Sequence, residues 1–282
     1  MVEKIMNEKL PVGVFKEVIG KEVNWSEGEK GELERDFLDW TSDIKGKMLP
    51  QVKVPIYDGV SNITFQDVNL EADTNIPMQF QLLNCYMKQV IRNSSVMDCE
   101  VTVYKYKALQ NLPSGETFAL TWQNDLLSAS TGRTNLSTAA DVLNYPTTHP
   151  LLSRDLHAKF KVYKKFKVRL GPGEEFSVTL KSFPKRIDLQ RMHDLESELT
   201  TLNYVRNISH GIYITAIGTP VHDSTTTTNV NHSSGKLDIL ETRTLRFRFN
   251  MGQSTKHYYF SDARQSVGTG QQANDGQDME QG

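Results

Sequence analysis

The chain has 282 residues, of which 38% are hydrophobic, and a formal net charge of -2 at pH 7. A chain of this length buries roughly 70 to 75% of the surface that its unfolded form exposes, so we expect a core that needs no metal ion, cofactor or disulfide bond. The sequence has no apolar run of about 18 residues and no secretory leader, which predicts synthesis in the cytosol without membrane insertion.

The first fifty residues are acidic, with eleven Asp and Glu against eight Lys and Arg. Within them, Ser26 and Glu29 form a capping-box pattern, and hydrophobic residues follow at helical spacing up to Gly46. We therefore predict a helix over residues 26–46. We assign residues 1–50 to an N-terminal acidic, partly helical segment.

The next part of the chain has the pattern of strands. Residues 74–86 and 98–107 alternate hydrophobic and polar side chains, and turn residues separate them, which predicts two strands. Each strand carries one of the two cysteines, Cys85 and Cys99. Their surroundings indicate buried free thiols, while a single disulfide bond would require an oxidising compartment.

A long polar connection follows, residues 111–150, with one short helix predicted near residues 137–143. The chain then becomes strongly basic, because residues 151–191 hold eleven Lys and Arg but only four Asp and Glu. This concentration of charge, in a chain that is nearly neutral, indicates a polyanionic partner.

The basic stretch has the pattern of a hairpin. Hydrophobic and cationic side chains alternate over residues 158–170, the sequence Gly-Pro-Gly at 171–173 indicates a turn, and the alternation resumes over 175–182. We predict a hairpin with one hydrophobic and one cationic face. Lys164 breaks the alternation and indicates a bulge or a sheet edge.

Residues 188–203 carry leucine and methionine at steps of three and four, which predicts another helix. Strands are predicted again over residues 211–221 and 236–250. In the last of these strands, Arg246 and Arg248 alternate with hydrophobic residues and repeat the cationic pattern of the hairpin.

Strands separated by turns, with helices only in connections, indicate an all-β fold and exclude a parallel sheet. The long excursions between strands favour an antiparallel eight-stranded jelly-roll sandwich, a double Greek key, with two or three short helices in connections. We assign residues 51–262 to this domain. The polar residues 263–282 are expected to form a disordered tail.

The sequence has no local catalytic signature, because its seven histidines are scattered and no metal-binding or nucleophile-elbow motif occurs. We therefore expect a protein that is not an enzyme. Exposed tyrosines are able to stack on nucleic-acid bases, although a place in the core or in a subunit contact is commoner. The tyrosines considered for stacking are Tyr104, Tyr106, Tyr258 and Tyr259.

Lysines on a strand face often serve only to protect a sheet edge. Five cations of one parity within eleven residues exceed that need, so we interpret them as a surface for nucleic acid, with an intersubunit salt-bridge surface as the competing explanation. The candidate nucleic-acid-binding residues are Lys159, Lys161, Lys165, Lys167, Arg169, Arg246 and Arg248.

Five stretches in this order resemble the capsid proteins of small circular single-stranded DNA viruses that encode a replication initiator, the circovirus-like group. They span about residues 70 to 250 and read TNIPMQFQLLNCYMK, LTWQNDLLSASTG, HPLLSRDLHAKFKVYKKFKVRLGPGEEFSVTLK, YITAIGTPVHD and KLDILETRTLRFRF. The resemblance implies an eight-stranded jelly roll whose copies close into an icosahedral shell, with the cationic hairpin face toward DNA or between subunits. It also implies a basic N-terminal arm, where this sequence has an acidic segment.

We therefore expect a viral capsid protein that self-assembles as a homo-oligomer around a single-stranded DNA genome. It would be found in the virion and made in the host cytoplasm, with or without passage through the nucleus. Two other classes stay open: a lectin-like jelly-roll module that binds ligands without assembly, and a jelly-roll enzyme that acts on carbohydrate.

Overall fold

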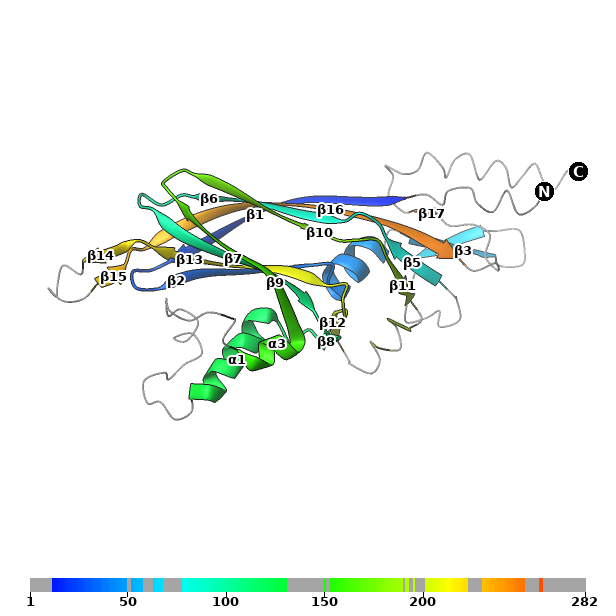
Figure 1. Cartoon of the computed structure of the whole chain (residues 1–282). Coiled ribbons are helices and arrows are strands. Elements are labelled where there is room, and N and C mark those ends of the chain that lie inside the picture. The colour runs from blue at the N-terminus through cyan, green and yellow to red at the C-terminus, as the bar shows by residue number, and fades with distance from the viewer. Residues whose placement is uncertain are drawn as a thin grey trace, which may run out of the picture.

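Two antiparallel β-sheets, sheet A and sheet B, pack face to face in the computed structural model (Figure 1). The structure describes residues 12–49, 52–57, 63–67, 78–130, 150, 153–189, 191–192, 195, 201–222, 230–251 and 259–260. In this part of the chain, no helix has the length and apolar character that a membrane span requires.

Sheet A has six strands in four positions. They are β1 (Gly13–Trp25), β5 (Met78–Leu82), β6 (Tyr86–Asn93), β10 (Glu175–Lys181), β11 (Lys185–Asp188) and β16 (Gly235–Met251). β1 pairs along one side of β16, and β6 followed by β5 pairs along the other side. β10 then pairs with β6, and β11 pairs with β5, so the sheet is four strands wide.

Sheet B has four strands and packs against one side of sheet A. In their order across the sheet they are β2 (Lys30–Phe37), β13 (His210–Gly218), β7 (Cys99–Ala108) and β9 (Phe160–Leu170). β9 is therefore an edge strand, with a partner on one side only among the described residues.

The order of the strands is that of a jelly roll. If β5 with β6 and β10 with β11 each count as one strand, sheets A and B together contain eight strands in the described part of the chain. Sheet A then holds the first, eighth, third and sixth strands, and sheet B holds the second, seventh, fourth and fifth. Two such sheets, connected as a double Greek key, define the fold. The predicted eight-stranded jelly-roll sandwich is confirmed.

The other elements lie in the connections between these strands. They are the π-helix η1 (Trp40–Met48), the helices α1 (Phe118–Ser130) and α3 (Arg154–Lys159), and the short strands β3 (Val52–Tyr57), β4 (Ile63–Asp67), β8 (Leu112–Pro113), β12 (Leu202–Tyr204), β14 (Pro220–His222), β15 (Val230–His232) and β17 (Tyr259–Phe260). α1 and α3 cover the outer side of sheet B (Figure 1). The short helix predicted near residues 137–143 lies outside the described residues.

Residues 30–37 form strand β2, so the prediction of a helix over residues 26–46 is wrong there. Leu33 and Phe37 are four residues apart, a spacing that places two side chains on one face of a helix and also on one face of a strand. Both pack into the core between the sheets, and helical structure begins only at η1. Since β1 and β2 pair within the two sheets, the jelly roll begins well before the predicted boundary at residue 51. The predicted tail, residues 263–282, lies outside the described residues.

β9 and β10 form at the predicted positions, but the predicted hairpin between them is wrong. β9 pairs with β7 in sheet B, whereas β10 pairs with β6 in sheet A. The reason is the hydrophobic face of each strand, because two such faces are buried more fully across a sandwich than side by side. Phe166 of β9 and Phe176 of β10 meet in this way, edge to face, with ring centroids 5.4 Å apart.

A β-bulge interrupts β9, as Lys164 indicates. Lys164 lies opposite Lys105, but Val162 lies opposite Tyr106, so Tyr163 is an extra residue without a partner in the register. Directly opposed residues of paired strands share a face, and therefore the bulge exchanges the two faces of β9. The expectation of a bulge or an edge is confirmed, since β9 has both.

The exchange divides the hydrophobic residues of β9 between two cores. Phe166, Val168 and Leu170 belong to the core between the sheets, whereas Phe160 and Val162 belong to a second cluster on the outer side of sheet B. This outer cluster, which we call the tyrosine cluster, lies beneath α1 and α3. Its buried members are Tyr104, Tyr106, Ala108, Leu112, Phe118, Trp122, Leu156, Phe160, Tyr204 and Tyr213.

The core between the sheets also contains a buried ionic network. Glu241 of β16 accepts hydrogen bonds from Arg35 Nη2 of β2 at 2.9 Å and from Gln89 Nε2 of β6 at 2.8 Å. Arg243 donates from Nε to Glu241 at 2.6 Å and from Nη1 to Asp43 of η1 at 2.8 Å. Burial opposes ionisation, yet the hydrogen bond from Arg35 and the charge of Arg243 lower the pKa of Glu241 to about 2. The network thus joins both sheets and η1.

Cys85 and Cys99 are buried and free, as the sequence indicates. Burial raises the pKa of each thiol to about 11, so both stay protonated and unreactive at neutral pH. The helix predicted over residues 188–203 is described in part: Leu189 and Met192 are helical and buried, and Leu195 packs against the same core. The prediction is wrong at both ends, because Asp188 belongs to β11 and Leu202 begins β12.

Candidate nucleic-acid interface

Three of the predicted nucleic-acid-binding residues, Lys165, Lys167 and Arg169, project together from the outer face of sheet B. Each is exposed but already contacts a neighbour within the subunit. Lys167 pairs with Glu100 at 2.5 Å, Arg169 pairs with Asp98 at 2.8 Å, and Lys165 Nζ lies 5.3 Å from the centroid of the Tyr104 ring. Much of the positive charge of β9 is therefore balanced inside the protein.

Lys159 and Lys161 are separated from these three by the bulge. Lys159 belongs to α3 and pairs with Glu116 at 2.6 Å. Lys161 is exposed and lies opposite Lys107, on the other face of the strand from Phe160. The five predicted cations between residues 159 and 169 do not form the single cationic face that their parity predicts.

Arg246 and Arg248 lie on the opposite side of the molecule, on the outer face of sheet A. Leu245 and Phe247, the neighbours of Arg246 in β16, are fully buried between the sheets, so alternation directs the two arginines outward. The seven predicted residues therefore do not share one surface, because the bulge exchanges the faces of β9 and because β9 and β16 belong to different sheets.

Arg246 and Arg248 have basic neighbours that the sequence pattern does not reveal. Cross-strand register places Lys16 opposite Thr244, Thr244 opposite Tyr86, and Tyr86 opposite Lys181, so these four side chains form one row across sheet A. A second row contains Arg248, Gln81 and Arg186. Lys88 lies two residues from Tyr86 and shares its face. We call this surface the basic face; its cations are Lys16, Lys88, Lys181, Arg186, Arg246 and Arg248.

The cations of the basic face have no acidic partners among the described residues. Five of the six are exposed and Arg248 is half-buried, and none takes part in an ion pair with a described residue. The other end of the sheet is mixed in charge: one row contains Glu22, Asp238, Arg92 and Glu175, and Lys236 pairs with Glu22 at 2.8 Å and with Asp238 at 3.4 Å. The excess of positive charge on the outer face of sheet A therefore lies at the end that carries the basic face.

The backbone beneath the basic face is held by the bulge between β5 and β6. The amide of Leu83 donates to the carbonyl of Arg246 at 2.8 Å, and the amide of Arg246 donates to Cys85 Sγ at 3.3 Å. Cys85 Sγ in turn donates to the carbonyl of Arg246 at 3.3 Å. These bonds fix the position of the strand segment that carries the two arginines.

The tyrosines considered for base stacking have a different role where they are described. Tyr104 and Tyr106 are 3% and 0% exposed and belong to the tyrosine cluster, so no base is able to reach them. Tyr258 and the side chain of Tyr259 lie outside the described residues. Tyr86, which the pattern did not single out, is 39% exposed in the middle of the basic face.

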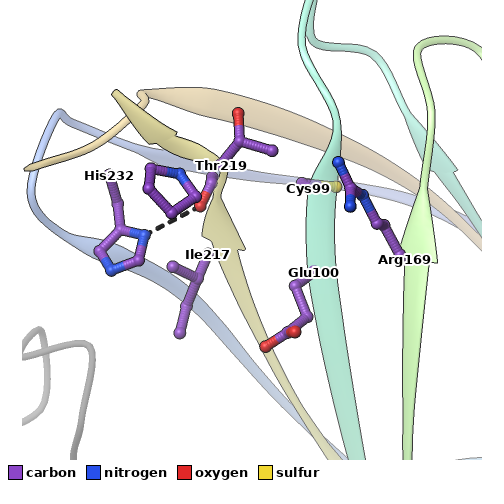
Figure 2. Close-up of a pocket in the computed structure, with 8 residues that line it drawn as sticks. Cys99, Glu100, Arg169, Ile217, Thr219 and His232 are labelled. Carbon is purple, nitrogen blue, oxygen red and sulfur yellow. Dashed lines mark hydrogen bonds between the residues drawn. The ribbon is translucent and has the colours of Figure 1, made fainter. Parts of the chain in front are cut away.

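A hollow of about 340 Å³ lies at one end of the outer side of sheet B (Figure 2). Glu100 and Arg169 line it, but both are engaged with Lys167 and Asp98. His232 Nδ1 lies 3.0 Å from the carbonyl oxygen of Gly218. No group of metal-binding side chains occurs in the described part of the chain, and the thiol of Cys99, whose pKa burial raises to about 11, is protonated at neutral pH.

Comparisons with known proteins give the chain no family. No protein-family model and no curated protein sequence matches it. A structure of deformed wing virus carrying the GFP gene is similar at 12% identity and a TM-score of 0.27, over 89% of this chain but only 47% of that one. The chain therefore spans about half the length of that protein.

Two polyomavirus proteins are similar over a larger share of their length. VP1 of Merkel cell polyomavirus in complex with 3'-sialyllactosamine has 11% identity and a TM-score of 0.18, over 85% of this chain and 78% of that one. Apo VP1 of chimpanzee polyomavirus has 9% identity and a TM-score of 0.18, over 86% and 79%. At these scores the likeness carries no argument on function, and the strand order itself establishes the jelly roll.

Proposed function

We propose that this chain is a viral capsid protein that self-assembles into a closed icosahedral shell around a single-stranded DNA genome, as the sequence resemblance implies. The observation that carries the proposal is the basic face, six cations without described acidic partners on one outer surface of a jelly roll. The cations extend over about 20 Å along the strands and about 14 Å across them. An area of this size fits a polymer of phosphates better than one small ligand.

The charge of the basic face makes a quantitative expectation possible. Each cation that neutralises a phosphate of a single strand releases counterions and contributes about 0.7 to the slope of log affinity against log salt. Six such contacts correspond to a slope of about 4. The near-neutral total charge of the chain keeps repulsion between assembled copies small.

Several exposed hydrophobic side chains support assembly into a homo-oligomer. Val96, at the turn between β6 and β7, is 93% exposed, and Val18 and Leu240 on the outer face of sheet A are 66% and 51% exposed. Burying such side chains against another copy contributes about 25 cal/mol for each Å² removed from water. Contacts between subunits would then hold the shell, and the virion would be the place where the protein acts.

Electron microscopy of the purified full chain tests the proposal. We expect uniform hollow particles whose absorbance ratio at 260 over 280 nm reveals bound nucleic acid. Replacing Lys88, Lys181, Arg246 and Arg248 by Gln should lower that ratio while particles still form. Protein that stays monomeric at high concentration and carries no nucleic acid would contradict the proposal.

A lectin-like module without assembly is the second candidate, and the hollow beside Glu100 and Arg169 favours it. Its volume lies at the small end of the range for ligand pockets, about 300 to 1,000 Å³. A monomeric protein whose glycan binding is lost in the Arg169→Gln variant would support this candidate against the capsid protein.

A further inference from the structure

We propose that Tyr86 and Phe183 form a base-stacking platform on the basic face, which makes this surface selective for single-stranded over double-stranded nucleic acid. The inference rests on the proposed function, since it concerns the same surface. It adds the two aromatic side chains and the kind of strand that they accept.

Tyr86 lies at the centre of the cationic rows. Its direct cross-strand neighbours are Thr244 on one side and Lys181 on the other, and Lys88 follows two residues along the same face. Tyr86 is 39% exposed although a paired strand flanks it on each side, β16 and β10. A strand of nucleic acid with its phosphates on these cations would therefore place a base against this ring.

Phe183 is the more unusual residue, because it is 81% exposed on a protein with ample core to bury it. It lies between β10 and β11, where the buried Ser182 donates its amide to the carbonyl of Cys85 at 2.9 Å and keeps the chain on the sheet. Residues 182–184 are not part of a strand, and the exposed fraction of Phe183 shows that its side chain extends into solvent. In the chain it stands between two members of the basic face, Lys181 and Arg186.

The two aromatic residues are close enough to act on neighbouring bases. Lys181 lies directly opposite Tyr86, and Phe183 is two residues further along the chain, so the Cα atoms of Tyr86 and Phe183 are at most about 13 Å apart. Bases that are close together along one strand are therefore able to meet the two rings. Two bases, one on each ring, would then be held while flanking phosphates contact Lys181 and Arg246.

Base stacking on a side chain distinguishes single from double strands by a simple physical difference. The bases of a single strand present their faces to any aromatic ring, whereas those of a duplex are already stacked on one another. Cations alone attract both forms through their phosphates. The aromatic pair therefore supplies the preference, and the six cations supply most of the affinity.

Sheet B provides a matched control in Tyr163. It is 44% exposed, similar to Tyr86, and stands at the bulge of a lysine-rich edge strand. Its ring, however, meets the ring of His210 edge on at 6.2 Å. Replacement of Tyr163 removes an exposed aromatic side chain from basic surroundings without affecting the proposed platform.

The experiment measures binding of labelled oligothymidylate of about 20 nucleotides, and of a duplex of equal length, to the full chain at about 50 and 200 mM salt. We expect Tyr86→Leu and Phe183→Leu each to weaken oligothymidylate binding about tenfold. Duplex binding and the salt slope should stay unchanged, and Tyr163→Leu should bind both probes like the unmodified protein. On irradiation, oligonucleotides that contain bromodeoxyuridine should crosslink to peptides that contain Tyr86 or Phe183.

The outcomes separate the platform from the proposed function. If the unmodified chain binds oligothymidylate with a steep salt slope but both leucine variants bind equally well, the platform is wrong and the basic face stands. The platform is also overturned if Phe183→Leu abolishes particles while binding per chain is unchanged, because Phe183 is then a subunit contact. If the unmodified chain binds neither probe, the genome-binding part of the proposed function fails with it.

Discussion

The outer faces of sheets A and B both carry lysines and arginines, but they differ in what surrounds them. On sheet B the cations of β9 pair with Glu100 and Asp98 or lie over Tyr104, and α1 covers the neighbouring surface. On sheet A the basic face is open and has no acidic partner among the described residues. The comparison shows that the number of charges along a strand is a poor guide to function, since partners across the sheet decide which charges stay available.

The two faces also differ in how they are covered. α1 is fixed to sheet B by Glu34, which accepts hydrogen bonds from the amides of Phe118 and Ala119 at 2.8 and 3.0 Å. The ring of Phe118 stacks on Tyr106 with centroids 4.2 Å apart. Sheet B thus uses its outer face to stabilise the subunit, whereas most cations on the outer face of sheet A stay exposed.

The largest effect on stability should come from weakening the contact between α1 and the outer face of sheet B. Phe118 is fully buried, so Phe118→Ala should lower the free energy of unfolding by about 3 to 5 kcal/mol. Leu120, on the same helix but 42% exposed, is the control, and Leu120→Ala should change it by about 0.5 kcal/mol. Urea unfolding measures both. Equal losses in the two variants would mean that α1 does not pack as described.

The second effect concerns the basic face. Replacing Lys88, Lys181, Arg246 and Arg248 together by Gln should reduce the slope of log affinity against log salt for single-stranded DNA by about 3. The control replaces Lys161, Lys165, Lys167 and Arg169 by Gln, which removes the same number of charges from β9. We expect a smaller change there, because two of these four residues are ion-paired. A larger change in the β9 variant would reverse the assignment.

A third effect is a dependence of stability on pH, which arises on the outer side of sheet B beneath α1. The hydroxyl of Tyr106 lies 2.9 Å from Glu34 Oε1 and 2.8 Å from Asp36 Oδ1, yet it has one hydrogen to donate. Burial, and then the charge of Glu34, raise the pKa of Asp36 to about 7. This pKa is above the unfolded value of about 3.9. Protonated Asp36 therefore stabilises the folded protein fully below about pH 3.9, and this contribution is lost as the pH rises through 7.

We therefore expect the Tm to fall as the pH rises from about 4 to about 7, to change little above about pH 8, and to fall less in Asp36→Asn. Asp39, whose pKa burial and the charge of Asp43 raise to about 6, acts in the same direction, so the difference between the two proteins isolates Asp36. Tyr106 and Tyr204 stay protonated, since burial raises the pKa of each phenol further. Identical pH profiles for the two proteins would exclude Asp36 as the titrating group.

The smallest effect should come from the exposed ion pairs of β9. Lys167 and Arg169 are 57% and 71% exposed, so replacing each by Gln should change the free energy of unfolding by less than about 1 kcal/mol. Chemical denaturation of the double variant provides the measurement. A loss of several kcal/mol would show that these pairs hold the edge of sheet B.

Alternation along the chain was enough to predict the fold class and the positions of β9, β10 and β16, because burial of one strand face is a local property of the sequence. Pairing was not predictable, because alternation shows which face of β9 and of β10 is hydrophobic but not which strand lies beside each; β9 pairs with β7 and β10 pairs with β6. The helix over residues 26–46 failed for a related reason, since a four-residue spacing fits both periodicities. Bulges such as that at Tyr163 exchange faces without any change of composition.

For the candidate site, the sequence identified Arg246 and Arg248 but not their basic neighbours. Lys16, Lys88 and Arg186 come from three strands far apart in the chain, and only cross-strand register brings them into adjacent rows. A short stretch of sequence does not predict which residues of distant strands lie opposite each other. Tyr86 and Phe183 were missed because exposure, and not residue type, distinguishes them from the tyrosines of the core.

The ionic network around Glu241 and Arg243 has one more consequence, which concerns fidelity of folding. A shift of the β16 register by a single residue would expose the charges of Glu241 and Arg243 and bury Arg246. Arg246 would then have no acidic partner among the described residues. Breaking a buried ion pair costs about 3 to 5 kcal/mol, so a misaligned strand would be strongly disfavoured. The buried ion pairs thus favour a single register of β16, and in this register Arg246 and Arg248 face outward.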